Sequence, residues 1–435
     1  MKDIVFSTKS ALIAQGVQKG DTIVVIAESS AAYACLICAS WSIGCIVAPL
    51  STRYPQAITD DLILKLNPQL VISDQIDLLP NRICLYTLCP YTSNSFHGVG
   101  FADLNLDLDC IANIIFSSGS SGQPKGIVHS LSNHYYSALG AHSQIPFSCH
   151  DTWGAMLPFC HISGLSLIMR SLLHGGSLLF PTDGEIEVKY LDQLTHISLV
   201  PTQLIRLIAD GANRGILSHF CAILVGGSSV SSELRAKCHN FGLPLYTTYG
   251  SSEMSSQIST TREGRAVVEN NSGNVLPHRE VHIAPSGEVL VRGKTLFQGY
   301  WQNGKVTTDC DLQGWYHTGD RGAISTGGEL IIKGRIDLMF ISGGENIYPE
   351  EIEQALEKHP MIDKAVVVAR DSEEFGQRPI AYVKFTDGAV DGADIKSFLK
   401  NQLSGFKVPD KFLQWPSDIP DTLKLNRSHF DNLTI

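Results

Sequence analysis

The chain alternates short apolar or β-branched runs with longer segments that mix apolar and polar residues. The strand-like runs are bounded by turn formers and lie at residues 21–29, 44–50, 68–74, 196–202, 221–227 and 243–250. An amphipathic stretch at 232–240 separates two of them and is typical of a helix. This alternation predicts an α/β fold built of layered helices and sheets.

Residues 29–48 form an uncharged run that is long enough to span a bilayer. The run is rich in Ser and Ala and is interrupted by Gly44 and Pro49, so we expect a buried helix to about Ser42 and then a core strand. The first residues also lack the basic start and apolar core of a signal peptide. We therefore expect a cytoplasmic protein with no membrane insertion.

The pattern changes in the last third of the chain. Short strands joined by Gly-containing turns predict a β-rich subdomain at about 274–334. A helical segment at 349–360 followed by two apolar strands then predicts a compact α+β unit. A boundary near Gly334–Asp337 would divide the chain into a large N-terminal domain, 1–335, and a small C-terminal domain, 336–435.

Composition limits the classes of function. With 435 residues, the chain is long enough for two or more domains. Its net charge of −10 argues against a nucleic-acid partner, since phosphate backbones require clustered Lys and Arg. The eleven cysteines have no regular spacing, and no second pair completes a metal site with Cys35 and Cys38. We interpret these two as packing on one side of a helix, in a reducing compartment.

The strongest chemical signal is the Gly- and Ser-rich segment Ser117–Gly126, which follows a strand-like run. Backbone N–H groups and hydroxyls in such a loop can turn toward one anion, and a lysine adds positive charge. It is not a Walker A loop, because Gly126 follows Lys125 directly. A plain linker would not need the Pro-Lys-Gly ending. The candidate phosphate-binding residues are Ser117, Ser118, Gly119, Ser120, Ser121, Gly122 and Lys125.

This loop resembles the phosphate loop of the adenylate-forming superfamily, which includes acyl- and aryl-CoA ligases, firefly luciferase and adenylation domains. Further family motifs follow in family order at 226–228, 249–253, 315–320 and 334–337. The resemblance implies contacts to adenine, ribose, phosphate and Mg²⁺. It assigns adenine to Gly226, Gly227, Ser228, Tyr249 and Gly250, ribose to Asp320 and Arg335, phosphate to Ser252, and Mg²⁺ to Glu253. Taken alone, 226–228 is equally well read as a strand-to-helix turn.

The resemblance extends to the C-terminal domain. It implies a hinge at Asp337, although Leu338 stands where the family has an acidic residue. Gly343 and Gly344 match the loop that lines the thiol channel. Lys424 matches the catalytic lysine by position, with Leu423 in place of the usual glycine.

Together these motifs imply an enzyme that joins a carboxylic acid to AMP with release of pyrophosphate and then transfers the acyl group to CoA. The implied cofactors are ATP and Mg²⁺, with CoA as co-substrate. All reacting groups are anionic, so the site must supply positive charge and oriented donors. In the family, rotation of the small domain exchanges the catalytic lysine for the thiol loop between the two reactions.

Residues without an ATP role indicate the acid. His161, Ser163 and Gly164 match the position of a family pocket, and Arg206 could hold a second carboxylate or simply lie on a helix surface. Residues 158–164, 198–206 and 374–379 resemble the o-succinylbenzoate–CoA ligase group of menaquinone and phylloquinone biosynthesis. The chain enters at the family's first long helix, so we expect a short N-terminus.

Alternatives remain open at this point. Another aryl- or acyl-CoA ligase shares every ATP motif, and so does a stand-alone adenylation domain that loads a carrier protein. A non-catalytic nucleotide-binding relative is a different class, and it is disfavoured by Glu253, Asp320, Arg335 and Lys424. The expected partners are a small carboxylic acid, ATP and CoA, and a homodimer is compatible with the sequence.

Overall fold

The computed structural model describes residues 1–74, 83–118, 124–181, 188–262, 271–302, 304–343, 345–372, 374–386, 391–417, 427–431 and 433. Several residues expected at the site lie outside this part of the chain. They are Gly119, Ser120, Ser121, Gly122, Gly344 and Lys424.

The first sheet has eight strands in the order β18-β17-β7-β6-β2-β1-β3-β4. Its central strands β1 (Thr22–Ile26), β2 (Ile46–Pro49) and β3 (Leu70–Ser73) are parallel. Ile23 and Val25 of β1 face one apolar core and Val24 and Ile26 face another, so this strand is buried on both sides. An uninterrupted apolar run is the pattern expected of such a strand. The remaining strands are β4 (Ile83–Cys84), β6 (Ile111–Ser118), β7 (Pro124–Ser130), β17 (Gly299–Gln302) and β18 (Lys305–Thr307).

The second sheet has the order β14-β13-β12-β11-β10-β8-β9-β5. Strands β8 (Thr152–Gly154), β10 (His196–Leu199), β11 (Ala222–Val225) and β12 (Leu245–Ser251) run parallel, and the last three lie in predicted strand-like runs. Leu224 faces the core shared with the first sheet, whereas Ile223 and Val225 face the outer helices. The other strands are β5 (Ser95–His97), β9 (Ser177–Leu179), β13 (Ser256–Thr260) and β14 (Asn274–Val275).

Three helices lie between the two sheets: α2 (Ala31–Ile43), α5 (Leu131–His142) and α6 (Ile162–His174). Helix α2 is the expected buried helix. Ser30 caps it by accepting a hydrogen bond from Tyr33 N, and Gly44 ends it with φ 87°. Cys35 and Cys38 are fully buried in it, which confirms the packing interpretation. In the described part of the chain, no helix is long and apolar enough to cross a membrane.

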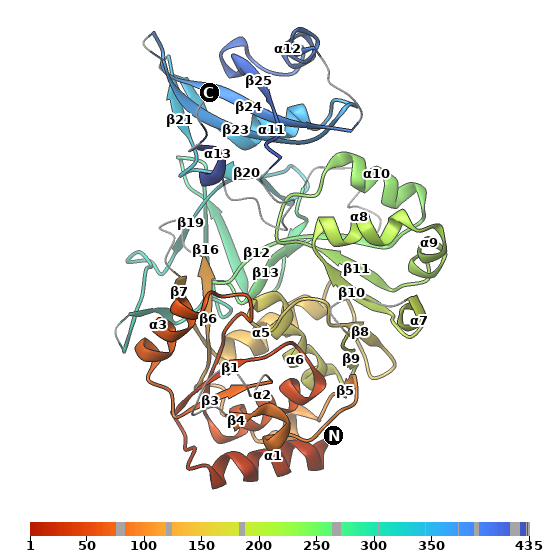
Figure 1. The fold of residues 1–435 in the computed structure, drawn as a ribbon, viewed down its shortest axis with the longest axis vertical. Helices are drawn as coiled ribbons and strands as arrows, with labels where there is room; N and C mark the ends of the chain where they lie inside the picture. The colour runs from red at the N-terminus through yellow and green to blue at the C-terminus, as the bar shows by residue number, and fades with distance from the viewer. Residues whose placement is uncertain are drawn as a thin grey trace.

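The outer faces carry the other helices (Figure 1). Helix α3 (Gln56–Leu66) covers the first sheet, and α8 (Pro201–Ala209), α9 (Gly211–Leu217) and α10 (Ser232–Asn240) cover the second. Four further segments complete these layers, and α1 packs on α2. They are α1 (Lys2–Ala14), α4 (Leu85–Leu88), α7 (Val188–Leu191) and the 3-10 turn η2 (Phe101–Leu104).

The β-rich segment contributes to three sheets. Its strands β15 (Arg279–Ile283), β16 (Glu288–Gly293), β19 (Tyr316–Ile324) and β20 (Leu330–Arg335) form an antiparallel sheet of their own. The hairpin β17–β18 instead pairs with β7 of the first sheet, through Tyr300 opposite Ile127. Strand β14 extends the second sheet.

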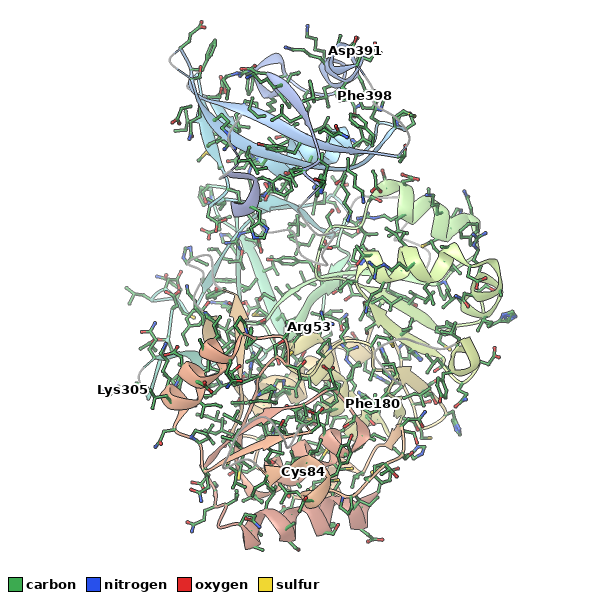
Figure 2. All side chains as sticks on the ribbon, in the orientation of Figure 1. Arg53, Cys84, Phe180, Lys305, Asp391 and Phe398 are labelled. Carbon is green, nitrogen blue, oxygen red and sulfur yellow. The ribbon has the colours of Figure 1, made fainter. Side chains whose placement is uncertain are left out.

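The C-terminal residues form a separate α+β unit at the top of Figure 1. Its strands are β21 (Phe340–Ser342), β22 (Glu345–Ile347), β23 (Ile362–Ser372), β24 (Gly376–Phe385) and β25 (Lys411–Gln414). Helices α11 (Pro349–Leu356) and α12 (Gly392–Lys400) pack on one face of this sheet, and α13 (Ser428–Asp431) packs on the other. Phe398 of α12, labelled in Figure 2, packs against the apolar core on the face covered by α11 and α12. The unit also contains the 3-10 turn η4 (Gly405–Lys407).

Candidate active site

The predicted nucleotide residues gather at the carboxyl ends of the parallel strands of the second sheet. Strand β11 ends at Val225 and leads directly into Gly226, while neighbouring β12 carries Tyr249 near its end. In open α/β sheets, ligands bind in the crevice outside these strand ends. The sequence thus places two of its separate motifs on one edge of one sheet.

Two glycines permit the backbones to approach closely here. A Cβ atom at Gly226 would lie 2.6 Å from Thr248 Cγ2, and one at Gly250 would lie 2.0 Å from Ser256 O. A side chain at Gly250 would require a backbone shift, and one at Gly226 would have to displace the Thr248 methyl group. Gly227, with φ +82°, and Ser228 are exposed beside them. The turn at 226–228 therefore lies against the strand that carries Tyr249.

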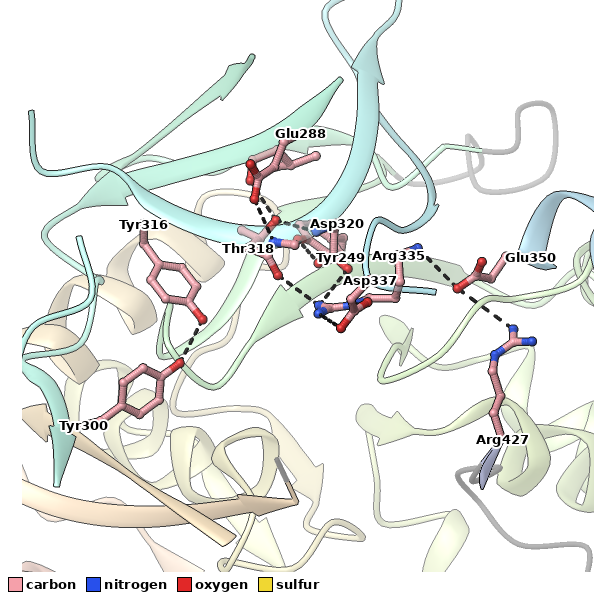
Figure 3. A network of polar contacts seen from close by, with 12 residues as sticks. Tyr249, Glu288, Tyr300, Tyr316, Thr318, Asp320, Arg335, Asp337, Glu350 and Arg427 are labelled. Carbon is pink, nitrogen blue, oxygen red and sulfur yellow. Dashed lines mark hydrogen bonds and ion pairs between the residues drawn. The ribbon is translucent and has the colours of Figure 1, made fainter. Parts of the chain in front are cut away.

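Tyr249 is connected to two strands of the third sheet by a polar network (Figure 3). Its hydroxyl donates a hydrogen bond of 2.5 Å to Asp320 Oδ2. Arg335 Nη1 donates to Asp320 Oδ1 at 3.3 Å and to the Thr318 carbonyl at 2.9 Å. Strands β19 and β20 hold this geometry because Asp320 lies opposite Arg335 in their register.

Burial and charge act in opposite directions on this network. Burial, reinforced by Asp320, raises the pKa of Tyr249 well above its usual value, so Tyr249 remains a hydrogen-bond donor. Burial also raises the pKa of Asp320, although Tyr249 and Arg335 both stabilise its carboxylate. The result is one carboxylate held between a phenol and a guanidinium. Such a group can accept hydrogen bonds from a diol such as ribose.

The same arginine reaches the predicted hinge. Arg335 Nε and Nη2 donate to the two carboxylate oxygens of Asp337 at 2.9 and 2.8 Å. This bidentate pairing lowers the pKa of Asp337. The backbone N–H of Arg335 donates to Glu350 Oε1 at 3.2 Å, which connects β20 to helix α11 of the C-terminal unit. Arg335 therefore links Asp320, the carboxylate predicted to bind ribose, to the boundary between the N-terminal domain and the C-terminal unit.

Glu253 lies beside Tyr300, whose hydroxyl faces that of Tyr316 (Figure 3). Tyr300 donates to Glu253 Oε1 at 2.9 Å, and the hydroxyls of Tyr300 and Tyr316 lie 2.8 Å apart. Because Tyr300 uses its proton on Glu253, Tyr316 donates to Tyr300. Lys125 Nζ, from the end of the phosphate-type loop, lies 5.4 Å from the centre of the Tyr300 ring. Lys125 and Glu253 thus both lie beside Tyr300.

Ser252, which precedes Glu253, is also hydrogen-bonded to strand β7, which follows the phosphate-type loop. His129 of β7 donates from Nε2 to the Ser252 carbonyl at 2.6 Å. Asn113 Nδ2 then donates to His129 Nδ1 at 3.1 Å. Burial lowers the pKa of His129 to about 4, so the ring is neutral near pH 7. The bond from His129 to Ser252 joins the first sheet to the segment that follows β12, and Asn113 of the neighbouring strand β6 holds the His129 ring in place.

The donor set at Glu253 fits a divalent cation. Oε1 accepts from Tyr300, while the described residues supply no donor to Oε2. Mg²⁺ prefers carboxylate oxygens combined with phosphate oxygens and water. Ser117 of β6 lies opposite Lys125 of β7, so the described beginning of the phosphate-type loop lies next to its described end.

The residues predicted for the acid are placed on two elements. His161 precedes helix α6 and is exposed, Ser163 is half-buried in its first turn, and Arg206 is exposed on α8. Gly164 has a packing reason of its own. A Cβ there would lie 2.2 Å from Leu157 O and 2.4 Å from Pro158 O. Gly343 lies in the β21–β22 hairpin, where its N–H donates to Phe375 O at 2.9 Å.

Comparison with known proteins agrees with this geometry. The model of the AMP-binding enzyme family matches residues 5–301, and that of the AMP-binding enzyme C-terminal domain matches 351–424. The chain belongs to the AMP-binding enzyme family. The 2-succinylbenzoate–CoA ligase of Escherichia coli K12 is 34% identical over 376 residues, which cover 84% of this chain and 80% of that protein. The ligase of the same name from Salmonella typhimurium is 31% identical, covering 95% and 87%.

Solved structures share the whole architecture. E. coli MenE with a bound phenylether-linked analogue of OSB-AMS has a TM-score of 0.81 at 29% identity, covering 97% of this chain and 90% of that one. Bacillus subtilis o-succinylbenzoate CoA synthetase in complex with OSB-AMP has a TM-score of 0.84 at 24% identity, covering 99% and 92%. The expected α/β fold and enzyme family are confirmed. The chain is an AMP-forming acid–CoA ligase similar to the o-succinylbenzoate–CoA ligases.

Several residues of this site were missed in the sequence. Tyr300 and His129 carry no recognisable motif, and Tyr316 stood inside the string 315–320 without being singled out. Glu288, which accepts from Gly319 N at 3.1 Å, lies on a different hairpin from the residue it holds. For His129, the one sequence signal was its position on an apolar strand three residues after Gly126.

Proposed function

We propose that this AMP-forming acid–CoA ligase uses o-succinylbenzoate as its acid and takes part in menaquinone or phylloquinone biosynthesis. The observation that carries the proposal is the polar network that joins Tyr249 of the second sheet to Asp320 and Arg335 of the third, close in sequence to Glu253. It is found in a chain similar over 95% of its length to a ligase with that substrate name. The acid carboxylate attacks the α-phosphate of ATP and expels pyrophosphate. The thiol of CoA then displaces AMP from the carbonyl.

The nucleotide would lie along the second sheet's edge. In this proposal Tyr249 stacks on adenine beside Gly226, Gly227, Ser228 and Gly250, and Asp320 with Arg335 accepts and orients the ribose. Two features support it. Tyr249 is held by its hydrogen bond to Asp320, and the two glycines, Gly226 and Gly250, put no side chain of their own at that edge. A rigid aromatic face loses little freedom when a base stacks on it.

The triphosphate would lie between the Ser117–Lys125 loop and Glu253, with Ser252 nearby. Glu253 would hold Mg²⁺, which when bound offsets phosphate charge. The Tyr300 hydroxyl fixes the orientation of the Glu253 carboxylate, and Lys125 adds a cation on the same side. Oriented charge in a preorganised site is the main source of stabilisation expected for this reaction. The proposed catalytic lysine, Lys424, and Gly119–Gly122 lie outside the described residues.

The acid would be bound by the α6 and α8 segments. Arg206 is the proposed partner of a second carboxylate, with His161, Ser163 and Gly164 beside the acid. Because Arg206 is exposed on α8, its guanidinium is available to a dianionic ligand. A monocarboxylic substrate would have no use for this cation.

We also propose two domain arrangements, with residues 1–335 and 336–435 turning about Asp337. In the structure Asp337 is paired with Arg335, and Glu350 spans the boundary. Turning at Asp337 would break these bonds and bring Gly343 and Gly344 toward the acyl group. Such hinges absorb the change in a few residues at the end of an element.

The test is a CoA-thioester assay with o-succinylbenzoate, benzoate and fatty acids, together with acid-dependent exchange of pyrophosphate into ATP. We expect exchange and thioester formation with o-succinylbenzoate above the other acids. Preference for a monocarboxylic acid would refute the substrate, and release of phosphate in place of pyrophosphate would refute adenylation. Transfer to a carrier protein but not to CoA would indicate a stand-alone adenylation domain. We expect a cytoplasmic homodimer, to be tested by light scattering and cell fractionation.

A further inference from the structure

A second cluster of ligand-type side chains lies at the opposite edge of the second sheet. Strands β8, β10 and β11 are parallel, so their first residues meet at one edge, away from the Gly226 end. Asp151 immediately precedes β8, His196 begins β10, and Cys221 immediately precedes β11. One ligand atom from each residue lies within 4.8 Å of the other two. The proposed reaction uses none of them.

The imidazole of His196 is fixed in one orientation. Only 1% of the residue is exposed, and its ring stacks on Trp153 with centres 4.9 Å apart. Nε2 lies 2.9 Å from the Pro146 carbonyl, which can only accept, so Nε2 carries the proton. Nδ1 therefore carries the lone pair, and it lies 2.8 Å from the Thr195 hydroxyl. A ligand histidine is commonly held in this way, with the other nitrogen donating to a carbonyl.

Asp151 and Cys221 are positioned by the surrounding backbone. Ser148 donates from its N–H and its hydroxyl to Asp151 Oδ2, at 2.8 and 2.7 Å. Cys221 N donates to Thr195 O at 2.7 Å, so the start of β11 is joined to the start of β10. Cys221 is exposed and Asp151 is half-buried, whereas His196 is buried. Solvent therefore reaches the cluster from the Cys221 side.

We propose that Asp151, His196 and Cys221 form a site for a thiophilic divalent metal ion, best matched by Zn²⁺. Zinc binds thiolate sulfur, imidazole nitrogen and carboxylate oxygen, which are the three donors present. Typical zinc–ligand distances place neighbouring ligands roughly 3.3–3.7 Å apart, so the three ligand atoms, which lie within 4.8 Å of one another, need to move inward only slightly. The metal ion would also replace the Thr195 hydroxyl at Nδ1 of His196. Binding releases the thiol proton of Cys221 to solvent, and water takes the fourth position.

The site has a structural consequence rather than a catalytic one. It joins the starts of three strands, and one of them, β11, leads at its other end into the proposed nucleotide residues at Gly226. A metal bound only by the folded chain stabilises it by mass action, without entering the reaction. Substitution of Cys221 should therefore leave adenylation unchanged, which makes the proposal independent of the proposed substrate.

The experiment uses the full chain, stripped of metal and kept reduced, without ATP. Titration with Co²⁺ should give a thiolate-to-cobalt charge-transfer band that saturates at one equivalent, and Zn²⁺ should displace it. Cys221→Ser should abolish the band and weaken Zn²⁺ binding roughly tenfold or more. Asp151→Asn, which keeps an acceptor for Ser148, should weaken binding without loss of the band.

Cys149→Ser is the matched control, because Cys149 is exposed and lies two residues from Asp151 but outside the cluster. It should keep the band and the affinity of the wild type. The proposal fails if the wild type binds no equivalent of Zn²⁺, if Cys221→Ser keeps the band, or if Cys149→Ser abolishes it. Because Cys221 is at the surface, its variant should fold normally, and its melting temperature without metal provides the check.

Discussion

The Tyr300 hydroxyl is the most direct test of the geometry around Glu253. Tyr300→Phe removes one oxygen atom and keeps the ring that packs against Phe297. It removes the 2.9 Å hydrogen bond to Glu253 Oε1 and the acceptor for Tyr316. The carboxylate would then be free to rotate away from the position that we propose for Mg²⁺.

The magnitude follows from the charge and burial of the bond. Only 8% of Tyr300 is exposed, so water does not readily replace the lost donor. A hydrogen bond to a charged group contributes about 1.5–3 kcal/mol. Since each 1.36 kcal/mol is tenfold in rate, we expect kcat/KM for MgATP to fall roughly 10- to 150-fold. The Mg²⁺ concentration for half-maximal exchange should rise as well.

The assay is acid-dependent ATP–pyrophosphate exchange at several Mg²⁺ concentrations. Tyr316→Phe is the control, because it keeps the Tyr300–Glu253 bond and removes only the second hydroxyl. A bond between neutral hydroxyls contributes about 0.5–1.5 kcal/mol, so this control should lose roughly tenfold at most. The reasoning is refuted if Tyr300→Phe stays within about twofold of wild type, or if both variants lose activity equally.

Four further predictions follow from other contacts. Lys424→Ala should abolish exchange but spare thioester formation from preformed acyl-adenylate, and equal loss of both would contradict two domain arrangements. Arg206→Ala should raise KM for a dicarboxylic acid and leave benzoate unaffected, which steady-state kinetics would decide. Burial lowers the pKa of His129 from 6.5 to about 4, so the unfolded chain binds the extra proton, and stability should fall by about 3 kcal/mol as pH drops from 6.5 to 4. Urea unfolding should show a weaker pH dependence in His129→Gln. Arg427→Met should destabilise the C-terminal unit by about 3 kcal/mol, because Glu353 loses its bidentate partner, and adding Glu353→Gln should restore most of it.

Much of the fold could be predicted from the spacing of apolar residues and the positions of turn-forming residues. The run at 29–48 is unambiguous once Gly44 and Pro49 are noticed, because a helix that ends at a left-handed glycine cannot continue across a membrane. The β-rich texture was visible too, but not the pairing of Tyr300 with Ile127. Long-range strand pairing depends on cores that no local pattern specifies, so the division of 274–334 among three sheets could not be read from the sequence.

Some residues of the candidate site could also be recognised in the sequence, and others could not. Tyr249, Asp320 and Arg335 stand in strings long enough to be recognised, and the structure places them within hydrogen-bond distance of one another. Tyr300 and His129 act on the Glu253 segment through hydrogen bonds to residues far away in sequence. A lone aromatic or histidine on an apolar strand has the same local appearance whether it packs or orients a carboxylate.

The path of the hairpin β17–β18 limits where this chain can be recombined with relatives. Because the hairpin leaves the third sheet, completes the edge of the first and returns, residues 1–335 are interlaced. A crossover near residue 274 would bring a foreign edge strand against β7, whose partner positions Ile127 and Val128 are buried. A crossover at 335–337 would instead sever few pairings, since no strand pair joins the two sides there in the described chain. Acid-binding and thiol-presenting halves should therefore be exchangeable only at that junction.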